Sequence, residues 1–244
     1  MNHACPPKSI SGFSATAGSG RACPLCLSSA VETISRKKVS SDSERNYWKC
    51  RQCRLIFLAP ENRLPLSEEK KRYDCHRNSP ADEGYVRFLK RLAEPLKCKL
   101  KSGFQGLDFG SGPGPALSTL MLEMGFHLEN YDPYYSPDDG LLKRQYDFVT
   151  CTEVVEHLRD PHHEFLLLNR LLKNEESYLG VMTEILEREE DFDRWWYPKD
   201  PTHICFYQKS TFEWLADWLG WHVEFPVKNV VIFSKAETKD EAQV

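Results

Sequence analysis

One ten-residue stretch, residues 106–115, constrains the fold of this chain more than any other part of the sequence. It combines a short apolar run with three alternating glycines and a proline, the pattern of a strand that turns sharply into a helix. Gly110, Gly112 and Gly114 carry no side chain, so the backbone can approach a ligand closely there. Residues 116–124 then carry apolar side chains at helical spacing. The stretch therefore predicts a strand, a glycine turn and a helix that form a binding site of nucleotide size.

A second strand and an acidic residue follow at an informative distance. Residues 128–132 have the character of a strand that ends in Asp132, 22 positions after Gly110. An acid about 20 residues after the first glycine is where doubly wound sheets hold ribose hydroxyls. The pattern Gly-x-Gly-x-Gly departs from the dinucleotide fingerprint, Gly-x-Gly-x-x-Gly, and this departure favours a different adenosine ligand.

Three motifs, residues 107–114, 131–133 and 146–158, lie at the expected ends of the first, second and fourth strands. Together they resemble the class I S-adenosylmethionine-dependent methyltransferases, with the ubiquinone O-methyltransferase-like branch as the most similar. The resemblance implies an α/β fold with a Rossmann-like, seven-stranded, mostly parallel sheet flanked by helices. Only 13 residues separate Asp132 from Tyr146, so we expect the third strand to be very short or absent.

The resemblance also implies a cofactor and the residues that hold it. Asp108 and the glycine turn would hold the methionine part of S-adenosylmethionine, and Asp132 would take the ribose hydroxyls. Thr152 and Glu153 would edge the pocket near the reacting methyl group, whereas the adenine contacts stay unassigned. The implied cofactor-binding residues are Asp108, Phe109, Gly110, Ser111, Gly112, Gly114, Asp132, Pro133, Thr152 and Glu153.

Candidate catalytic groups follow the fourth strand. A helix that starts there would put Glu153, Glu156 and His157 on one side, because positions three and four apart share a face. His203 is a candidate general base, since imidazole titrates near working pH. We take His203, His157 and Glu156 as the candidate catalytic residues.

A divalent metal is the alternative for this group. Glu153, Glu156, His157 and His203 are similar to the two Glu and two His that hold a divalent ion in small-RNA 3′-terminal 2′-O-methyltransferases. Such a set suits Mg²⁺ or Mn²⁺ near a ribose hydroxyl. Metal-free relatives carry a comparable start, in which the acids favour the positive end of a helix. A catalytic metal, a metal-free His203 base and a structural His203 therefore stay open.

Two cysteine pairs precede this region, Cys23 with Cys26 and Cys50 with Cys53, with 23 residues between the pairs. Four thiolates on two tight turns can converge on one tetrahedral ion, which predicts a zinc ribbon with strands at residues 31–39 and 47–49. The chain has nine cysteines and no export signal, so metal ligation is a better explanation than a disulfide framework. We expect the other five cysteines to be ordinary thiols.

The expected organisation follows from these motifs. We expect a disordered tail over 1–20, the zinc ribbon over 21–60, a helical linker or lid over 61–102, the methyltransferase domain over 103–236 and a tail over 237–244. Periodicity predicts the remaining elements, which are helices at 161–173 and 210–219, a strand at 177–183, and an edge hairpin at 222–225 and 230–233.

Two segments have two interpretations each. Residues 73–78 are polar with aromatic company and either reach the mouth of the pocket or form a solvated linker. Residues 184–207 are expected to be irregular. Their aromatic side chains either wall an acceptor pocket or cover the sheet as an apolar patch, and they include Trp195, Trp196, Phe206 and Tyr207.

Charge is divided unevenly along the chain. Residues 1–102 hold 20 Lys and Arg against 10 Asp and Glu, and residues 103–244 hold 12 against 26. The basic half either meets a polyanion such as RNA or docks on the acidic half. No apolar run approaches the roughly 20 residues that span a bilayer. With no signal-peptide pattern at the start, we expect a cytoplasmic protein without membrane contact.

These features predict an S-adenosylmethionine-dependent methyltransferase with a structural Zn²⁺ ion, acting on a small molecule or an activated sugar. RNA is the second candidate acceptor, because the Cys-Pro-Leu-Cys start resembles large-subunit rRNA guanine methyltransferases. Their zinc site includes a His and a much shorter spacing, which this chain does not match. A non-catalytic module that keeps the cofactor fold is the third alternative, and the oligomeric state is not indicated.

Overall fold

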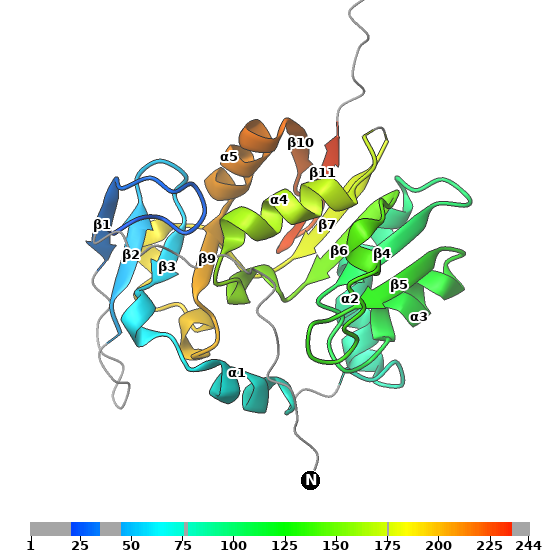
Figure 1. The fold of residues 1–244 in the computed structure, drawn as a ribbon, viewed down its shortest axis with the longest axis horizontal. Coiled ribbons are helices and arrows are strands. Elements are labelled where there is room, and N and C mark those ends of the chain that lie inside the picture. The colour runs from blue at the N-terminus through cyan, green and yellow to red at the C-terminus, as the bar shows by residue number, and fades with distance from the viewer. Residues whose placement is uncertain (1–20, 35–44, 76–77, 175, 236–244) are drawn as a thin grey trace, which may run out of the picture.

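Two β-sheets lie beside each other in the computed structural model, which describes residues 21–34, 45–75, 78–174 and 176–235 (Figure 1). The tails expected at 1–20 and 237–244 lie outside the described residues, as do residues 35–44, which include the end of the strand expected at 31–39. None of the helices among the described residues is long and apolar enough to cross a membrane.

The larger sheet has six strands in the order β10-β11-β7-β6-β4-β5. Its four strands from β7 to β5 are parallel, and β11 and β10 add an antiparallel hairpin at one edge, as predicted. The strands are β4 (Gln105–Phe109), β5 (His127–Tyr131), β6 (Phe148–Thr152), β7 (Tyr178–Met182), β10 (Trp221–Glu224) and β11 (Val230–Lys235). This is the expected α/β class with a mixed, mostly parallel sheet.

Helices cover both faces of this sheet because each buries one apolar stripe. Helix α2 (Glu83–Lys97) buries Leu89, Leu92 and Leu96, and its cap residue Asp82 accepts hydrogen bonds from two backbone N–H groups of the first turn. One face is covered by α2 and α3 (Ala116–Glu123), the other by α4 (Pro161–Leu171) and α5 (Lys209–Leu219). The parallel strands are therefore closed off from water on both sides, as such strands usually are.

The sheet has six strands, not the seven expected from the family resemblance. The 13 residues between Asp132 and Tyr146 hold a bridge from Asp132 to Ser136 and a 3₁₀ turn, η2 (Leu141–Lys143). A single parallel crossover takes a dozen or more residues. The whole segment is consumed by the return from β5 past β4 to β6, so no length remains for a further strand.

The smaller sheet has five strands in the order β1-β2-β3-β9-β8. Strands β1 (Val31–Ile34), β2 (Tyr47–Cys50) and β3 (Ile56–Leu58) form the ribbon, and β8 (Ile185–Leu186) and β9 (Cys205–Gln208) come from the segment expected to be irregular. Strand β3 pairs antiparallel with β9, Ile56 opposite Phe206 and Phe57 opposite Cys205. The expectation of an irregular segment was wrong, because its end is an apolar run that is buried between neighbours.

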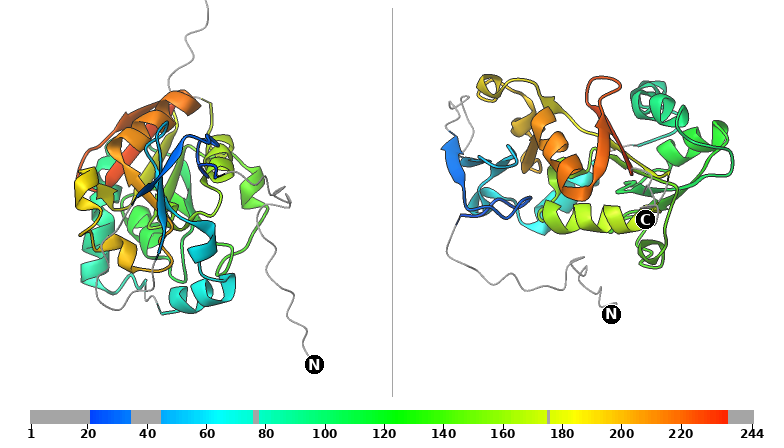
Figure 2. Two further views of the ribbon diagram at one scale, coloured as in Figure 1. Left: turned by 90° about the vertical axis from the view of Figure 1, so that its left-hand side faces the viewer. Right: turned by 90° about the horizontal axis from the view of Figure 1, so that it is seen from above.

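The remaining described elements connect the two sheets. Helix α1 (Leu66–Tyr73) follows the ribbon, and short 3₁₀ turns are η1 (Pro60–Asn62), η3 (Val155–His157), η4 (Glu189–Asp191) and η5 (Tyr197–Lys199). The ring of Tyr47 in the ribbon packs 5.2 Å from Phe192 and 5.8 Å from Phe206, centroid to centroid. Figure 2 shows the ribbon at one end of the molecule and α2 and α3 at the other. The ribbon thus packs on the segment that follows β7.

Candidate active site

The glycine turn lies at the carboxyl end of β4, where the backbone enters the left-handed region of φ and ψ. Gly110 and Gly112 have φ values of +79° and +67°, a region that costs residues with a side chain about 1–2 kcal/mol. The N–H groups of Gly110 and Ser111 both donate to the carbonyl oxygen of Tyr131, at 2.8 and 3.1 Å. The turn is therefore fixed to the end of β5, and its shape requires glycine.

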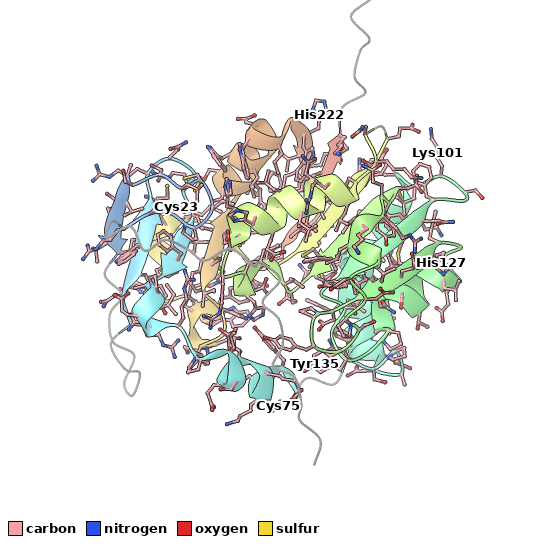
Figure 3. The ribbon with its side chains drawn as sticks, viewed as in Figure 1. Cys23, Cys75, Lys101, His127, Tyr135 and His222 are labelled. Atoms are coloured by element: carbon pink, nitrogen blue, oxygen red, sulfur yellow. The ribbon has the colours of Figure 1, made fainter. Side chains whose placement is uncertain are left out.

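Close neighbours also leave no room for side chains in this turn. A Cβ added at Gly110 would lie 2.5 Å from Val154 Cγ2, and one added at Gly114 would lie 1.9 Å from the carbonyl oxygen of Asn78. Asn78 therefore lies directly over the turn. The Tyr135 hydroxyl donates to Asp74 at 2.7 Å, next to the end of α1, and Figure 3 shows Tyr135 beside Cys75 there. Of the two interpretations of residues 73–78, these contacts with the glycine turn and with Tyr135 favour the first over a solvated linker; residues 76–77 lie outside the described residues.

Asp108 lies in β4, two residues before the first glycine of the turn. Its side chain is almost fully buried, and its Oδ1 accepts a hydrogen bond from Thr150 Oγ1 at 2.7 Å. Burial raises the pKa of Asp108 to about 7, against the hydrogen bond from Thr150, which lowers it. A carboxylate with this pKa gains from a cationic partner, such as the ammonium group of an amino acid.

Asp132 joins the turn to the loop that follows β5. Its carboxylate accepts the N–H of Gly112 at 3.0 Å and those of Tyr134 and Tyr135 at 2.8 and 3.1 Å. A carboxylate offers about four acceptor positions, so it has capacity for a further donor such as a hydroxyl. Both acids named from the sequence thus lie at the glycine turn.

The other expected cofactor residues differ in what they offer. Thr152, at the end of β6, has a buried hydroxyl with no hydrogen-bond partner among the described residues, and an orphaned buried hydroxyl is a sign of a missing ligand. The side chain of Phe109 instead stacks on Tyr131 at 5.5 Å in the core. Phe109 therefore offers a ligand only its backbone, and Pro133 is half-buried directly after Asp132.

The helix expected to start at Glu153 does not form. Only the 3₁₀ turn η3 follows β6, and Glu153 precedes it with a φ of +52° while its N–H donates to the carbonyl oxygen of Met182. Backbone in this conformation cannot begin an α-helix, so Glu153 does not share a face with Glu156 and His157. Burial, and then repulsion from Glu156 and Glu184, raises the pKa of Glu153 to about 9.

Glu156 is the most enclosed acid of the site, with no exposed surface. Its carboxylate accepts hydrogen bonds from the Tyr197 hydroxyl at 2.5 Å and from Thr183 Oγ1 at 2.9 Å. These two donors fix the orientation of the carboxylate and offset part of the cost of burying it. Sequence patterns did not point to either donor, although Thr183 ends a predicted strand.

His157 and His203 lie beside this carboxylate. Their rings are 4.8 Å apart, and one ligand atom from each of Glu156, His157 and His203 lies within 4.8 Å of the others. His157 Nδ1 is 3.0 Å from the carbonyl oxygen of Thr202, and His203 Nδ1 is 2.9 Å from that of Tyr197. A carbonyl oxygen only accepts, so Nδ1 carries the proton in both rings and Nε2 keeps its lone pair. Burial lowers the pKa of His203, which favours this neutral form.

Tyr73 belongs to the segment 73–78, for which the sequence left two interpretations, and it lies beside the imidazoles. Its ring meets His157 edge to face at 5.3 Å and lies 6.1 Å from Tyr134. Burial raises the pKa of Tyr73 far above its ordinary range, and nearby carboxylates add to the effect. A neutral phenol therefore lies between the loop after β5 and the two imidazoles.

The aromatic residues expected to wall an acceptor pocket are not grouped in that way. Phe206 and Tyr207 have no exposed surface, and Tyr207 stacks on Phe212 at 5.0 Å. Trp196 is 58% exposed. For Phe206 and Tyr207, the interpretation as an apolar layer that covers a sheet is therefore the one that fits.

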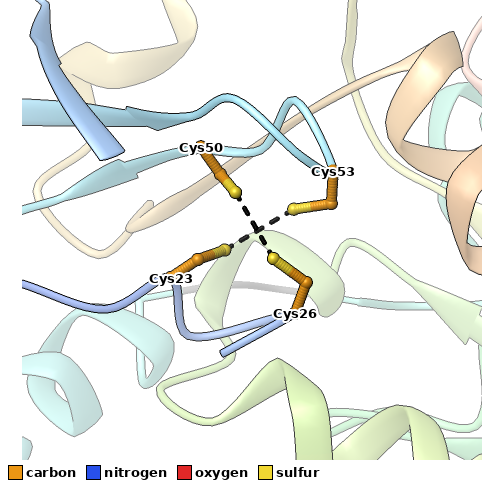
Figure 4. A group of neighbouring side chains, drawn as sticks. All are labelled: Cys23, Cys26, Cys50 and Cys53. Atoms are coloured by element: carbon orange, nitrogen blue, oxygen red, sulfur yellow. Dashed lines mark hydrogen bonds between the residues drawn. The ribbon is translucent and has the colours of Figure 1, made fainter. Parts of the chain in front are cut away.

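Four cysteine sulfurs converge in the ribbon, as the spacing predicted. Figure 4 shows the side chains of Cys23, Cys26, Cys50 and Cys53 pointing at one centre from two turns of the chain. The Sγ atoms of Cys23 and Cys53 are 3.5 Å apart, and those of Cys26 and Cys50 are 3.3 Å apart. These distances are far too long for disulfides and approach the edge of about 3.8 Å that a Zn–S bond of about 2.3 Å gives in a tetrahedron. The donor set fits Zn²⁺.

Comparison with known proteins gives one family. The family model described as "Methyltransferase domain" matches residues 73–224, more than half of the chain. A comparison with curated proteins gave no match.

Solved structures with a similar fold include methyltransferases. Magnesium protoporphyrin IX methyltransferase from Synechocystis PCC 6803, with bound SAH, is 13% identical with a TM-score of 0.45; the match covers 63% of this chain and 84% of that one. A SAM-dependent methyltransferase from Thermotoga maritima, titled a possible histamine N-methyltransferase, is 16% identical with a TM-score of 0.40 over 70% of this chain and 95% of that one. At such identities and TM-scores, these matches carry no conclusion about this chain.

Proposed function

The chain belongs to the methyltransferase-domain family, and we propose that it moves a methyl group from S-adenosylmethionine to a small-molecule acceptor. The observation that carries this proposal is the glycine turn, where a side chain at Gly110 or Gly114 would collide with Val154 or Asn78. Only a backbone without side chains fits there, and two buried acids lie beside it. The branch within the family and the acceptor go beyond the family match and are part of the proposal.

The residues at the turn are suited to different parts of the cofactor. The Asp108 carboxylate would hold the methionine ammonium group, and Asp132 would accept the ribose hydroxyls. The unpartnered hydroxyl of Thr152 and the half-buried Glu153 would edge the site near the sulfonium. When bound, S-adenosylmethionine supplies an activated methyl group, so the protein's task is mainly to align the acceptor and exclude water.

His157 and His203 would take up the proton that the acceptor loses. Both rings present an Nε2 lone pair, since Nδ1 donates to a backbone carbonyl. The Glu156 carboxylate, 4.0 Å from His157 Nε2, stabilises the imidazolium that results. The hydroxyl and the carbonyl oxygen of Tyr197 fix Glu156 and His203 respectively.

A divalent ion is the alternative use of the same atoms. Glu156, His157 and His203 form a group with one carboxylate and two imidazoles, and Glu153 is not part of it. Imidazole favours transition metals over Mg²⁺, so Mn²⁺ fits this set better than Mg²⁺. Electron paramagnetic resonance of added Mn²⁺ separates the two uses. If the group binds a metal, the wild type should show a signal of bound Mn²⁺ that the His203→Ala protein lacks. If it acts without metal, the spectra of the two proteins should not differ in this way.

We further propose that Cys23, Cys26, Cys50 and Cys53 hold a structural Zn²⁺ ion. Three of these thiols are buried in a ribbon whose strands are only three or four residues long. Strands this short supply few backbone hydrogen bonds of their own, and four thiolate bonds to one ion add stabilisation.

The distribution of ion pairs supports a small acceptor over RNA. Basic side chains of the first half pair with acids of the second half, which is the docking interpretation of the uneven charge. The pairs are Lys49–Glu189, Arg54–Glu189, Arg72–Asp200, Lys99–Glu224 and Lys101–Glu176. Cations engaged in this way are less available for phosphates. A cytoplasmic location remains part of the proposal.

Calorimetry with S-adenosylmethionine tests the proposed function. We expect saturable binding well below millimolar concentration, and its absence would favour the non-catalytic module. A salt titration with structured RNA tests the other acceptor, because neutralising several phosphates makes affinity fall steeply with salt. No binding at low salt, or a flat response, would remove RNA as a candidate.

A further inference from the structure

Strand β9 holds the proton-accepting group in place. The N–H of Ile204 donates to the carbonyl oxygen of Glu156 at 2.8 Å, and the Tyr207 hydroxyl donates to that of Val155 at 3.1 Å. The Cys205 thiol donates to the carbonyl oxygen of Leu158 at 3.3 Å. The turn that carries Glu156 and His157 is thus bound at two points to β9 and at a third to Ile204, the residue before it, and His203 lies two residues before this strand.

One edge of β9 is paired with the ribbon. It pairs with β3, and the N–H of Leu58 also donates to the carbonyl oxygen of Ile204 at 2.9 Å. Its only other strand partner in the described sheet is β8, which has two residues. Two short strands alone are marginally stable in water. Figure 1 shows β9 between the ribbon strands and the larger sheet, where Tyr207 also packs on Phe212 of α5. Of the two strands that pair with the backbone of β9, β3 is the longer.

The second cysteine turn fixes β3. The N–H of Cys50 donates to the carbonyl oxygen of Leu55 at 2.9 Å, and the N–H of Arg54 to that of Cys50 at 3.1 Å. Gln208 Nε2, at the end of β9, donates to the carbonyl oxygen of Arg54 at 3.0 Å. Backbone hydrogen bonds therefore run without a break from the Cys50–Cys53 turn through β3 and β9 to Glu156.

The glycine turn has no such dependence. Within the described part of the chain, its N–H groups at Gly110, Ser111 and Gly112 donate to Tyr131 and Asp132, all in the larger sheet or its loops. Among the residues that the structure describes, the ribbon forms no hydrogen bond with this turn. Disturbing the ribbon is therefore expected to move the proton-accepting group while the cofactor residues stay in place.

We propose that the Cys50–Cys53 turn and its metal ion are positioning elements for the methyl-acceptor side of the active site. By fixing β3 and thus β9, they set where Glu156, His157 and His203 lie. This inference rests on the proposed zinc site and on the proposed role of the imidazoles. It adds that the ribbon acts on the reaction without touching the cofactor.

Hydrogen exchange measured by mass spectrometry on the full chain tests this inference. Three variants are compared with the wild type: Cys53→Ser, which removes a ligand; Cys53→His, which keeps a zinc-binding group; and Cys98→Ser, an exposed thiol outside the ribbon. Zinc content, S-adenosylmethionine affinity and exchange in peptides from both sheets are measured for each protein.

We expect Cys53→Ser to lose zinc and to exchange at least about tenfold faster in peptides spanning residues 153–158 and 203–208. Exchange in β4 and β6, and cofactor affinity, should change less than about threefold. Cys53→His should restore protection, and Cys98→Ser should match the wild type. Removing zinc from the wild type with a chelator and adding it back should reproduce the loss and recovery of protection.

Two results would overturn the inference. One is unchanged protection of β9 and η3 in a protein that has lost its zinc. The other is equal loss of protection in β4 and β6, which would make the ribbon a general stabiliser and not a positioning element. A wild type that fails to bind S-adenosylmethionine would refute the proposed function instead, because the exchange comparison needs no cofactor.

Discussion

The two sheets of this molecule are built from different kinds of sequence information. The parallel core of the larger sheet comes from one continuous stretch, β4 to β7, and carries the glycine turn at its carboxyl edge. The smaller sheet joins residues 31–58 to residues 185–208, with the central strands of the larger sheet between them in the chain. The first therefore holds the proposed cofactor-binding residues by local connections, whereas the second contacts the turn of the proposed catalytic residues through a pairing that spans most of the chain.

We therefore expect the larger sheet to bind the cofactor and the smaller sheet to position the imidazoles, and variants in each sheet can test this. If the two sheets are separable in function, a change in the smaller sheet should spare cofactor binding, and a change in the glycine turn should weaken cofactor binding beyond its local cost in backbone strain.

Phe206→Ala should give the largest loss of stability. Phe206 has no exposed surface and packs between Tyr47 and Phe192, at the junction of ribbon and insertion. Removing a buried phenyl ring costs about 3–5 kcal/mol, which urea unfolding measures. Phe148→Ala is the matched control, because Phe148 is equally buried on the face of the larger sheet that α2 and α3 cover. It should lose stability too and, unlike Phe206→Ala, should weaken cofactor binding. A cost below about 1 kcal/mol at Phe206 would mean that the junction is not packed as described.

Gly110→Ala should separate cofactor binding from backbone strain. The new methyl group would meet Val154 in a backbone with φ near +79°, so we expect S-adenosylmethionine to bind at least about 30-fold more weakly by calorimetry, or about 2 kcal/mol. Gly125→Ala is the control, because its φ is +92° and nothing lies within 4 Å. It should cost similar strain, about 1 kcal/mol, without affecting affinity. Equal losses of affinity in both proteins would contradict the assigned binding site.

Glu189→Gln tests the ion pairs that join the ribbon to the insertion. Glu189 accepts from Lys49, whose side chain is only 5% exposed, and from Arg54 at 3.1 Å. Without the Glu189 carboxylate, the buried ammonium group of Lys49 keeps Glu32, at 3.8 Å, as its described acidic partner. We therefore expect the free energy of unfolding to fall by about 1–2 kcal/mol. The loss is smaller than for a fully buried pair because Glu189 is partly exposed. Glu187→Gln, in an exposed pair with Lys228, should change the unfolding free energy by less than about 0.5 kcal/mol. Equal effects would remove the special role of Lys49.

The pH dependence of cofactor binding should follow Asp108. Its pKa is raised from 3.8 to about 7, so the folded protein holds this proton between those values. The residue's contribution to the stability of the cofactor-free protein therefore falls as pH rises through that interval. Binding of a cationic ammonium needs the carboxylate, so affinity should rise about tenfold from pH 6 to pH 8. Thr150→Val removes a hydrogen bond that lowers the pKa of Asp108, so it should move the rise in cofactor affinity to higher pH. An affinity that does not depend on pH in either protein would exclude Asp108 as the ammonium partner.

What the sequence allowed us to predict was local. The glycine turn, the acid at 132 and the cysteine pairs each carry their signal within a few positions, and the edge hairpin and helices follow from periodicity. The short link between Asp132 and Tyr146 indicated a missing strand, yet the count of seven was taken from the resemblance. These turns, strands and helices depend on the conformation of neighbouring backbone residues and on the burial of one apolar face of each element.

The acceptor side could not be predicted in the same way. Glu156 and His203 meet because β9 pairs with β3, about 150 positions earlier in the chain, and no local preference specifies such a partner. One signal was present: residues 204–207 are four consecutive apolar residues, typical of a strand buried on both faces. The left-handed conformation of Glu153 had no visible signal, and this conformation removed Glu153 from the group with Glu156 and His157.

The pairing of β3 with β9 also bears on how this protein can be cut for expression. The family match begins at residue 73 and ends at 224, whereas β3 lies upstream of it and β11 downstream. A clone trimmed to those limits would bare the backbone of β9 on one side and of β7 on the other. Unpaired strand edges recruit strands from other chains, so we expect such a fragment to precipitate although it contains every proposed catalytic residue.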